Sequence, residues 1–283
     1  MKKLLTVLLV FATLLSTLSV VSCTGEEKIQ AKIIDVDLTE EEYAFGVCKD
    51  QPELLETVNE LISTIVSTGT FDDICNHYFG DGTPVAVKSA VEDPSKEQLI
   101  VATHAEFAPF SYKIGNNFYG IDIEIAALLA EELGQELVIK GMKFQEVMPA
   151  VKDHDADIAM TGLTMKEERK VYVDFSDTYY KASQKLIVLS DDDTFDKCKT
   201  GDDVLKLLRN YTMSTNIGCL IGTTGEMYVT NQGDYKNNGL KVTGTGYETG
   251  TLAVRDLLKG KITGVIIDAG PAASIVEEVN AEQ

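Results

Sequence analysis

The chain of 283 residues carries 45 acidic and 25 basic side chains, and its formal net charge is −20. This length can bury a sizeable core and exceeds the usual size of a single domain, so two lobes are expected. Nucleic-acid binding needs clustered Lys and Arg, and the sequence has no such stripe. The composition therefore excludes a nucleic-acid partner and disfavours electrostatic attachment to anionic lipid, and it does not identify a ligand.

An export signal is the clearest local feature of the sequence. Two lysines precede an apolar stretch over residues 4–21, and Cys23 follows it closely. A short positive segment before an apolar run is typical of a secretion signal. The cysteine resembles the lipobox of bacterial lipoproteins, which implies removal of residues 1–22, lipidation of Cys23 and a tether over residues 23–26. An uncleaved anchor or a plain secretory signal is the alternative. We expect an extracytoplasmic protein, lipid-anchored to the cell membrane.

Four cysteines follow Cys23, and export makes disulfides chemically possible. They form no CxxC pair, and the three histidines are scattered, so the sequence predicts no metal site. From their spacing alone, two disulfides and four free thiols are equally acceptable. The residues in question are Cys48, Cys75, Cys198 and Cys219.

From residue 99 onward, strand-like and helix-like runs alternate. Short apolar runs predict buried strands at residues 99–103, 137–139, 157–160, 185–189, 213–219 and 264–267. Helical spacing of apolar residues predicts helices at 122–133, 146–152, 249–259 and 271–279. Such alternation is typical of α/β architecture with mainly parallel sheets.

The segment before residue 99 has a different pattern. Residues 52–66 form a strongly amphipathic helical pattern whose apolar face runs from Leu54 to Val66. A second short helix is expected at 71–79. Residues 81–98 contain two prolines and no clear periodicity, which favours a linker.

Several ordered motifs resemble one protein family. They are FAPFSY at 107–112, YGIDIEIA at 119–126, FQEVMPAV at 144–151, DIAMTGLTMKEER at 157–169, VDFSDTYY at 173–180, IGTTG at 221–225 and GVIID at 264–268. This set resembles the amino-acid-binding extracellular solute-binding proteins (family 3) of ABC importers. The resemblance implies a type II periplasmic-binding-protein-like clamshell with two hinge crossings. It implies a monomer that binds a free amino acid without catalysis or a cofactor and delivers it to an ABC permease. A sensor without transport and a dehydratase-like enzyme are the alternatives.

The N-terminal segment resembles the C-terminal end of the same family. The matching stretches are EEYAFGV at 41–47, PELL at 52–55, GTFDDI at 69–74 and YFG at 78–80. This order implies a circular permutation in which residues 81–98 join the original termini; a fragment of a tandem protein is the alternative. The resemblance then places lobe one at residues 42–182 and lobe two at 27–40 and 186–283. Any disulfides should lie within a lobe, as Cys48–Cys75 and Cys198–Cys219.

The first group of candidate ligand-binding residues surrounds Arg169. Its guanidinium offers a fork of donors that suits a carboxylate, and in the family the matching arginine holds the ligand's α-carboxylate. Thr164 and Glu167 have the spacing of a capping box, which predicts a helix N-terminus whose free amides would favour an anion. By resemblance, Thr164 and the carbonyl of Gly162 contact the ammonium group.

The second group comes from the remaining motifs. Thr224 lies in a glycine-flanked turn and matches a family donor to the ligand carboxylate, while Asp268 matches the acid that pairs with the ammonium. Phe107 and Phe144 match aromatic positions that enclose the ligand side chain, although core packing would also explain them. His104 stands where relatives that bind glutamine or cationic amino acids often have an acidic residue. We therefore expect a polar or neutral amino acid.

Overall fold

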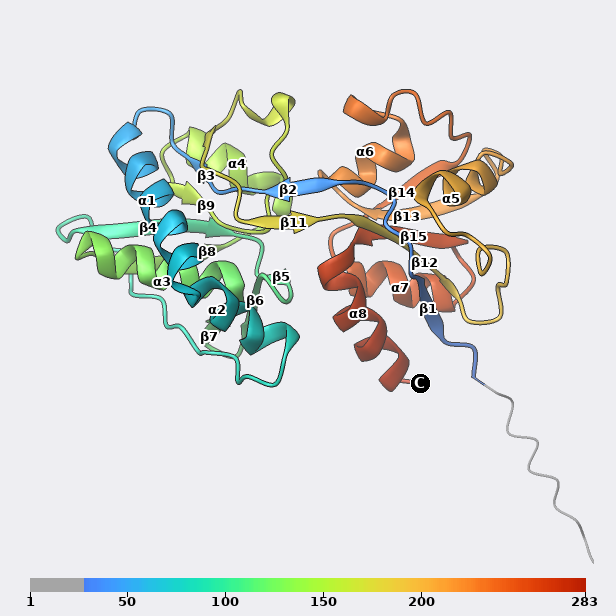
Figure 1. Ribbon diagram of the computed structural model, residues 1–283, viewed down its shortest axis with the longest axis horizontal. Helices are drawn as coiled ribbons and strands as arrows, with labels where there is room; N and C mark the ends of the chain where they lie inside the picture. The colour runs from blue at the N-terminus through green and yellow to red at the C-terminus, as the bar shows by residue number, and fades with distance from the viewer. Residues whose placement is uncertain (1–27) are drawn as a thin grey trace, which may run out of the picture.

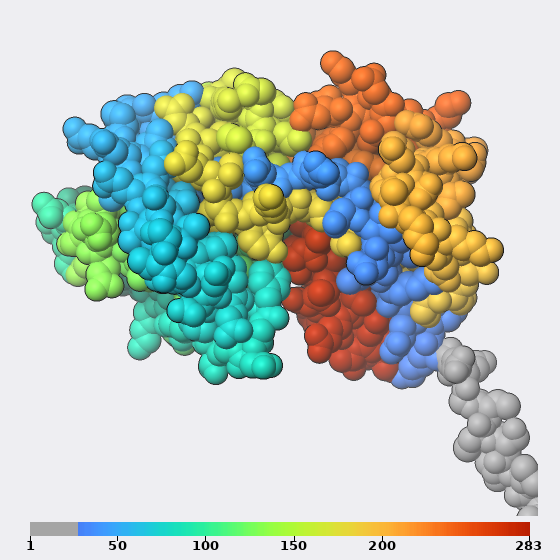
Figure 2. Space-filling model, viewed as in Figure 1, coloured from blue at the N-terminus to red at the C-terminus, as the bar shows by residue number. Residues whose placement is uncertain are grey.

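The structure is a computed structural model that describes residues 28–283. The predicted export signal and Cys23 lie outside the described residues. Two five-stranded sheets, each covered by helices, form two lobes that lie side by side and are joined by a pair of strands (Figures 1 and 2). Among the described residues, no helix has the length and apolarity that a membrane crossing would require.

Lobe one is the set of elements on the left in Figure 1, and its sheet has the strand order β10-β3-β9-β4-β8. Its strands are β3 (Gly46–Val47), β4 (Gln98–Thr103), β8 (Glu136–Gly141), β9 (Ile158–Ala159) and β10 (Asp174–Phe175). Its helices are α1 (Pro52–Thr68), α2 (Thr70–Phe79), α3 (Ile121–Leu133), α4 (Phe144–Lys152) and the 3₁₀ turn η1 (Glu167–Arg169). A small sheet beside them contains β5 (Glu106–Phe107), β6 (Ser111–Ile114) and β7 (Asn117–Tyr119).

Lobe two lies on the right in Figure 1, with the strand order β1-β12-β15-β13-β14. Its strands are β1 (Ala31–Ile34), β12 (Gln184–Leu189), β13 (Asn216–Leu220), β14 (Thr243–Tyr247) and β15 (Gly264–Asp268). Its helices are α5 (Gly201–Leu208), α6 (Thr224–Thr230), α7 (Gly250–Leu258), α8 (Ala269–Ala281) and the 3₁₀ turn η2 (Gly233–Tyr235).

Two antiparallel strands connect the lobes. They are β2 (Glu41–Tyr43) and β11 (Tyr180–Ala182), and Tyr43 pairs with Tyr180 while Glu41 pairs with Ala182. Both strands run from one lobe to the other in Figure 1. We call this pair the hinge strands.

The sheets are mixed, so the expectation of mainly parallel sheets is wrong. In lobe one, β4 pairs in parallel with β8 and β9, whereas β3 pairs antiparallel with β9 and β10. Lobe two repeats the pattern, with β13 parallel to β14 and β15, and β12 antiparallel to β1 and β15. The reason is that β3 and β12 enter their sheets from the hinge strands. They must therefore run opposite to β4 and β15, whose carboxyl ends point toward the junction.

The helix α1 is held by its apolar face, as its pattern predicts. Val58, Ile62 and Ile65 are buried and pack in the same core as residues of β2 and β3. Val66 was expected on this face but is 55% exposed, because one residue turns a helix by about 100° away from Ile65. The helix ends at Gly69, whose φ of 82° is a left-handed conformation that glycine adopts without steric cost.

The segment over residues 81–98 lacks helices but is not a free linker. The backbones of Val87 and Phe118 exchange two hydrogen bonds of 2.9 Å, and the amide of Ala90 donates to the carbonyl of Leu137 at 2.8 Å. The segment therefore runs along β8, an edge strand whose backbone groups would otherwise face solvent. The predicted strand at 213–219 begins only at Asn216, because a turn precedes it.

Candidate functional site

Arg169 lies at the junction of the two lobes. It ends the turn η1 and is 3% exposed. Its Nη1 donates to the carbonyl of Thr164 in lobe one at 2.8 Å, and its Nη2 donates to the carbonyl of Gly222 in lobe two at 3.0 Å. Its Nε is buried without a hydrogen-bond partner. One guanidinium thus connects both lobes, and its Nε–H group remains available to a ligand.

The helix expected from Thr164 and Glu167 is wrong. The structure forms only the single turn η1, which has Lys166 at its N-cap and no side-chain capping bond. Thr164 is extended and forms a bridge with Tyr43, so its hydroxyl turns toward β2 and donates to the carboxylate of Glu41 at 2.8 Å. The capping box is absent because this buried carboxylate takes the hydroxyl. An anion at this place would therefore be bound by the guanidinium of Arg169 and not by the free amides of a helix N-terminus.

Lobe two contributes Thr224 and the turn before it. Thr224 begins α6 and is 1% exposed. Its hydroxyl donates to Glu41 at 2.8 Å and accepts from Nε2 of Gln184 at 3.0 Å. Gly222 has a φ of 80°, and a Cβ there would lie 3.5 Å from the ring of Phe144. Glycine therefore permits the turn and brings its carbonyl up to Arg169.

Asp268 is a buried carboxylate near this arginine. It ends β15, is 4% exposed and accepts a hydrogen bond of 2.6 Å from the hydroxyl of Tyr43. Burial, together with the charge of Glu41, raises the pKa of Asp268 to about 7. Burial lowers the pKa of Arg169, and the charges of Asp268 and Glu41 oppose that effect. The junction therefore holds one buried cation and two buried acids that act on one another.

The two candidate phenylalanines each lie next to another candidate residue of lobe one. The guanidinium carbon of Arg169 lies 5.5 Å from the ring centroid of Phe144, and the His104 ring meets the same ring edge-on at 6.4 Å. Phe107 lies against Gly162, where a Cβ would come within 2.6 Å of its ring. Both phenylalanines also belong to hydrophobic clusters, so packing and an aromatic wall are compatible roles.

His104 lies next to the ring of Phe144, as Arg169 does. It is 5% exposed, and its Nδ1 has no hydrogen-bond partner. Burial lowers the pKa of His104, so the ring is neutral at pH 7. His104 lines a cavity of about 620 Å³ to which lobe one contributes Lys143 and lobe two contributes Glu248. These two residues form an ion pair across the junction at 2.5 Å.

Glu41 was not among the predicted site residues, yet it is the centre of the hydrogen-bond network. It is 5% exposed, and its Oε2 accepts from Thr164 and Thr224, one hydroxyl from each lobe. Its Oε1 accepts from the hydroxyls of Thr39 at 2.8 Å and Tyr235 at 3.1 Å. A single carboxylate on a hinge strand thereby connects the lobes.

A weak sequence signal for Glu41 existed. It is the middle of three consecutive glutamates, and residues in a strand point alternately to opposite faces. Glu40 and Glu42 are both exposed, whereas Glu41 between them is buried. From sequence alone, the three glutamates look like an ordinary charged segment on the protein surface. Only the position of the strand β2 distinguishes Glu41 from its two neighbours.

Asp122 is the first residue of the helix expected at 122–133, but it does not cap that helix. The residue before α3 is Gly120, and Asp122 is fully buried in the first turn. Its carboxylate accepts from the amide of Gly162 at 2.6 Å and from the hydroxyl of Tyr179 at 2.6 Å. Burial raises the pKa of Asp122 to about 7. Asp122 holds the turn at Gly162, whose φ is 57°.

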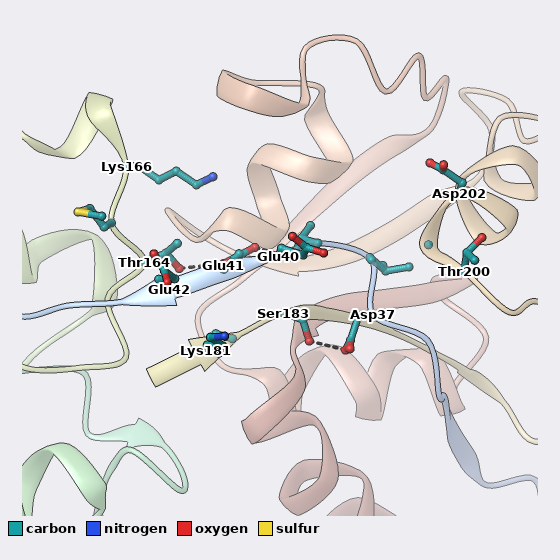
Figure 3. A pocket seen from close by; sticks show the side chains of 15 residues that line it. Asp37, Glu40, Glu41, Glu42, Thr164, Lys166, Lys181, Ser183, Thr200 and Asp202 are labelled. Carbon is teal, nitrogen blue, oxygen red and sulfur yellow. Dashed lines mark hydrogen bonds between the residues drawn. The ribbon is translucent and has the colours of Figure 1, made fainter. Parts of the chain in front are cut away.

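A hollow of about 950 Å³ runs along the hinge strands (Figure 3). Its lining includes Glu41 and Thr164 but neither Arg169 nor Asp268. Most of its other charged groups are acids, and Lys166 and Lys181 are its two basic residues. The hollow therefore does not contain the buried charges of Arg169 and Asp268. We assign the candidate site by those charges and not by the size of the hollow.

The four cysteines of the described residues are free thiols, so of the two alternatives left open by their spacing the structure shows free thiols, and neither Cys48–Cys75 nor Cys198–Cys219 is a disulfide. The thiol of Cys48 donates to Asp50 at 3.1 Å, and the thiol of Cys219 donates to the carbonyl of Thr245 at 3.7 Å.

Comparisons with known proteins identify the fold class first. The structure resembles the ancestral amino acid-binding protein AncCDT-1, a precursor of cyclohexadienyl dehydratase, with a TM-score of 0.55 and 30% identity over 64% of this chain and 74% of that one. It also resembles an arginine-bound ArgBP from T. maritima, with a TM-score of 0.54 and 31% identity over 64% of this chain and 78% of that one. The predicted α/β, type II periplasmic-binding-protein fold is confirmed.

The family follows from the sequence comparison. The model of the bacterial extracellular solute-binding proteins, family 3, matches residues 99–273, and the chain belongs to this family. The arginine-binding extracellular protein ArtP of Bacillus subtilis is 34% identical over 128 residues, which are 45% of this chain and 47% of that protein. A probable histidine-binding protein of Neisseria gonorrhoeae is 29% identical over 70% of this chain and 68% of that protein. The chain thus spans about half the length of the first relative and two thirds of the second.

One relative is an enzyme. Cyclohexadienyl dehydratase of Pseudomonas aeruginosa is 36% identical over 92 residues, which are 32% of this chain and 34% of that protein. The relatives named as binding proteins match longer stretches. The relatives of this chain therefore include both binding proteins and a dehydratase.

Proposed function

We propose that this protein is the solute-binding component of an amino-acid ABC importer and closes its two lobes around a free amino acid. One observation carries the proposal: Arg169 and Asp268, a buried cation and a buried acid, are both held at the junction. Arg169 donates to the backbone of Thr164, and Asp268 accepts from Tyr43, the residue that bridges to Thr164. Burying charges costs free energy unless each is compensated. A zwitterionic amino acid brings an opposite charge to both groups.

The carboxylate of the ligand would bind at Arg169. The guanidinium now donates to two backbone carbonyls and has Nε free. A carboxylate is a stronger acceptor than a carbonyl and can take two donors of the planar fork at once. Gly222 and Thr224 line the facing side of the junction, from lobe two.

The ammonium group of the ligand would bind at Asp268. An adjacent cation favours the ionised carboxylate and would counter the burial that raises the pKa of Asp268. Thr164 donates its own proton to Glu41, so its oxygen has a lone pair left to accept from the ammonium. The carbonyl of Gly162 is the further acceptor in this assignment.

The side chain of the ligand would extend past Phe107 and Phe144 toward His104. A neutral imidazole with an unpaired Nδ1 can accept or donate a hydrogen bond, but it supplies no charge. This supports a polar or neutral amino acid. The arginine-binding relatives make a cationic amino acid the alternative.

Closure would be a rotation about the hinge strands. We propose residues 42–182 as lobe one and residues 27–40 with 186–283 as lobe two. Three hydrogen bonds or ion pairs of the described residues cross the junction away from the hinge strands: Arg169 to Gly222, Lys143 to Glu248, and Lys166 to Asp234. A ligand held by groups of both lobes adds contacts that only the closed form makes, which shifts the population toward closure.

We also propose that the chain is circularly permuted and anchored through a lipid on Cys23. The family match begins at residue 99, and residues 28–80 nevertheless supply β2, β3, α1 and α2. The side chain of Asn280 exchanges hydrogen bonds of 2.8 and 2.9 Å with the backbone of Ala31. The end of α8 therefore lies beside β1, which supports a direct link between the two in an ancestor of conventional order.

A thermal-shift and calorimetry panel of all amino acids tests the function. A ligand at a hundredfold excess over its dissociation constant adds about 2.7 kcal/mol to the unfolding free energy. We expect one class of amino acid to raise the melting temperature and to be recovered chemically unchanged. The binding function is wrong if no amino acid does so, and conversion of the bound compound would favour the dehydratase alternative. Permease and ATPase genes beside this gene would separate transport from sensing.

A further inference from the structure

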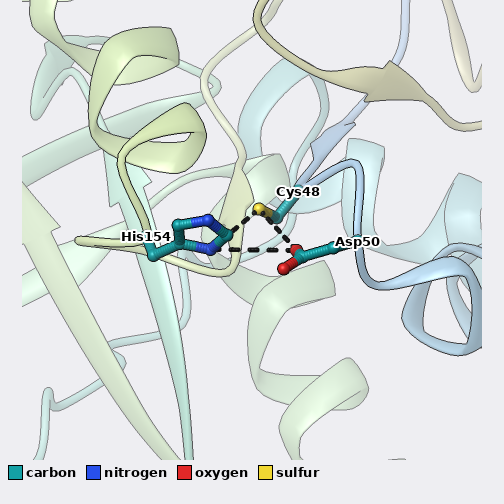
Figure 4. A group of neighbouring side chains, drawn as sticks. All are labelled: Cys48, Asp50 and His154. Atoms are coloured by element: carbon teal, nitrogen blue, oxygen red, sulfur yellow. Dashed lines mark hydrogen bonds and ion pairs between the residues drawn. The ribbon is translucent and has the colours of Figure 1, made fainter.

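A second polar cluster lies in lobe one and consists of Cys48, Asp50 and His154 (Figure 4). Cys48 and Asp50 belong to the turn between β3 and α1, and His154 belongs to the turn between α4 and β9. The pairing of β3 with β9 brings these turns together, although 106 residues separate Cys48 from His154. None of the three residues takes part in the proposed amino-acid site.

The three side chains present one lone-pair atom each to a common point. Sγ of Cys48 lies 3.4 Å from Nδ1 of His154 and 3.1 Å from Oδ1 of Asp50, and the latter two atoms are 3.8 Å apart. Around a tetrahedral zinc ion with Zn–S near 2.3 Å and Zn–N or Zn–O near 2.0–2.2 Å, neighbouring ligand atoms lie about 3.3–3.6 Å apart. The cluster needs shifts of only a few tenths of an ångström to match one face of that tetrahedron.

From this geometry we propose that Cys48, Asp50 and His154 bind a divalent zinc ion. A thiolate, an imidazole and a carboxylate together suit zinc better than the hard cations, which prefer oxygen ligands only. The side chains of His154 and Asp50 are 62% and 66% exposed, so water completes the fourth position. Zinc displaces the thiol proton that Cys48 now donates to Asp50, and the proton leaves to solvent.

The site has a consequence for stability. Zinc would tie the chain just before α1 to the loop that leads into β9, and both segments lie on the lobe-one sheet. A ligand of the folded form that does not bind the unfolded chain stabilises the fold by mass action. At a hundredfold excess over its dissociation constant, zinc should raise the melting temperature by roughly 5 °C.

Cobalt(II) is the probe for the ligand set, because a thiolate bound to cobalt gives a charge-transfer band and tetrahedral coordination gives intense visible bands. We expect one equivalent of cobalt to produce both signals in the reduced protein and one equivalent of zinc to abolish them. Cys48→Ser should remove the charge-transfer band. The matched control is Cys198→Ser, which changes a free thiol of lobe two and should leave both signals intact.

Two surface variants keep the test valid if Cys48→Ser should unfold the lobe. His154→Asn removes the imidazole but tolerates the left-handed backbone at this position, where φ is 65°. Asp50→Asn removes the charge and keeps the shape. Each should weaken zinc binding tenfold or more, since loss of even an outer-shell partner costs about 10–100-fold. The proposal is wrong if cobalt gives no thiolate band, or if zinc stabilises the His154→Asn protein as strongly as the unaltered one.

Discussion

Arg169 is the residue on which the proposed binding function depends most. Removing one partner of a buried, hydrogen-bonded charge pair costs about 2–5 kcal/mol, and each 1.4 kcal/mol is a factor of ten in affinity. We expect Arg169→Ala to weaken amino-acid binding at least about thirtyfold by calorimetry. Arg255→Ala is the matched control, because that arginine pairs with Glu282 on the surface of α7 and α8. Affinity within threefold of the unaltered protein would show that Arg169 does not hold the carboxylate.

The raised pKa of Asp268, to which the charge of Glu41 contributes, predicts how amino-acid binding depends on pH. The ligand ammonium binds the ionised form of Asp268, whose pKa in the ligand-free protein is about 7 against an ordinary value of 3.8. Affinity should therefore fall as the pH drops below 7, by up to tenfold per unit, because a proton must leave Asp268 before the ligand binds. Calorimetry between pH 5.5 and 8 measures this decline.

Glu41→Gln is the variant that separates the two acids. It removes the negative charge that helps to raise the pKa of Asp268, so the decline in affinity should move to lower pH. If the affinity of the unaltered protein does not change between pH 5.5 and 8, the assignment of Asp268 to the ammonium is wrong.

At the residue scale, the site residues that belong to motifs could be predicted from the sequence. A residue such as Glu41, which reaches the site only because of the direction its side chain takes from a strand, could not. Arg169, Thr224 and Asp268 occur in recognisable motifs, and the structure brings them to one junction. Glu41 could not be chosen among three adjacent glutamates before the register of β2 was known. The capping box at Thr164 was wrong because a local pattern cannot reveal a carboxylate 123 residues away in the chain.

At the scale of elements, the helices were more predictable than the strand pairings. Apolar periodicity located α1, α3, α7 and α8, since a long amphipathic pattern has few alternative structures. The short strands β2, β3, β5 and β10 have two or three residues each and carry no periodicity. Their antiparallel pairings arise from the two crossings between lobes, which only the complete fold defines.

The helix α1 should contribute strongly to the stability of lobe one. Ile62 is 4% exposed within the core that also contains Tyr43 and Phe45. Ile62→Ala should lower the unfolding free energy by about 2–5 kcal/mol, because the cavity is only partly refilled. Val66→Ala, on the exposed side of the same helix, should change it by no more than about 0.5 kcal/mol. Denaturant unfolding measures both, and equal losses would contradict the packing of α1.

At the scale of the whole molecule, the site is formed by segments that are far apart in sequence order. Lobe one combines residues before and after the segment 81–98, and lobe two combines β1 with everything after β11. The proposed ligand contacts, from His104 to Asp268, nevertheless lie on one uninterrupted stretch. The proposed displacement of the N-terminal segment would therefore change which lobe carries the proposed anchor and would leave the order of the binding groups unchanged.

A reordered chain tests the proposed permutation. Residues 81–283 are followed by a short Gly/Ser link and residues 28–80, so that only the bond between Gly80 and Asp81 is lost. The bonds between Ala31 and Asn280 place the new junction between segments that already touch, and the segment 81–98 keeps its contacts with β7 and β8. We expect the reordered protein to bind the same amino acid within about threefold, because openings in exposed loops are tolerated.

The matched control uses the same link but opens the chain inside α1, between Leu61 and Ile62. That cut divides a helix whose buried face packs on the core of lobe one, so this protein should not fold. Circular dichroism and calorimetry compare the two. If both reordered chains lose structure and binding, the present order is required for the fold and a simple permutation is wrong. If only the control fails, the binding groups depend on the positions of the segments in space and not on their order in the chain.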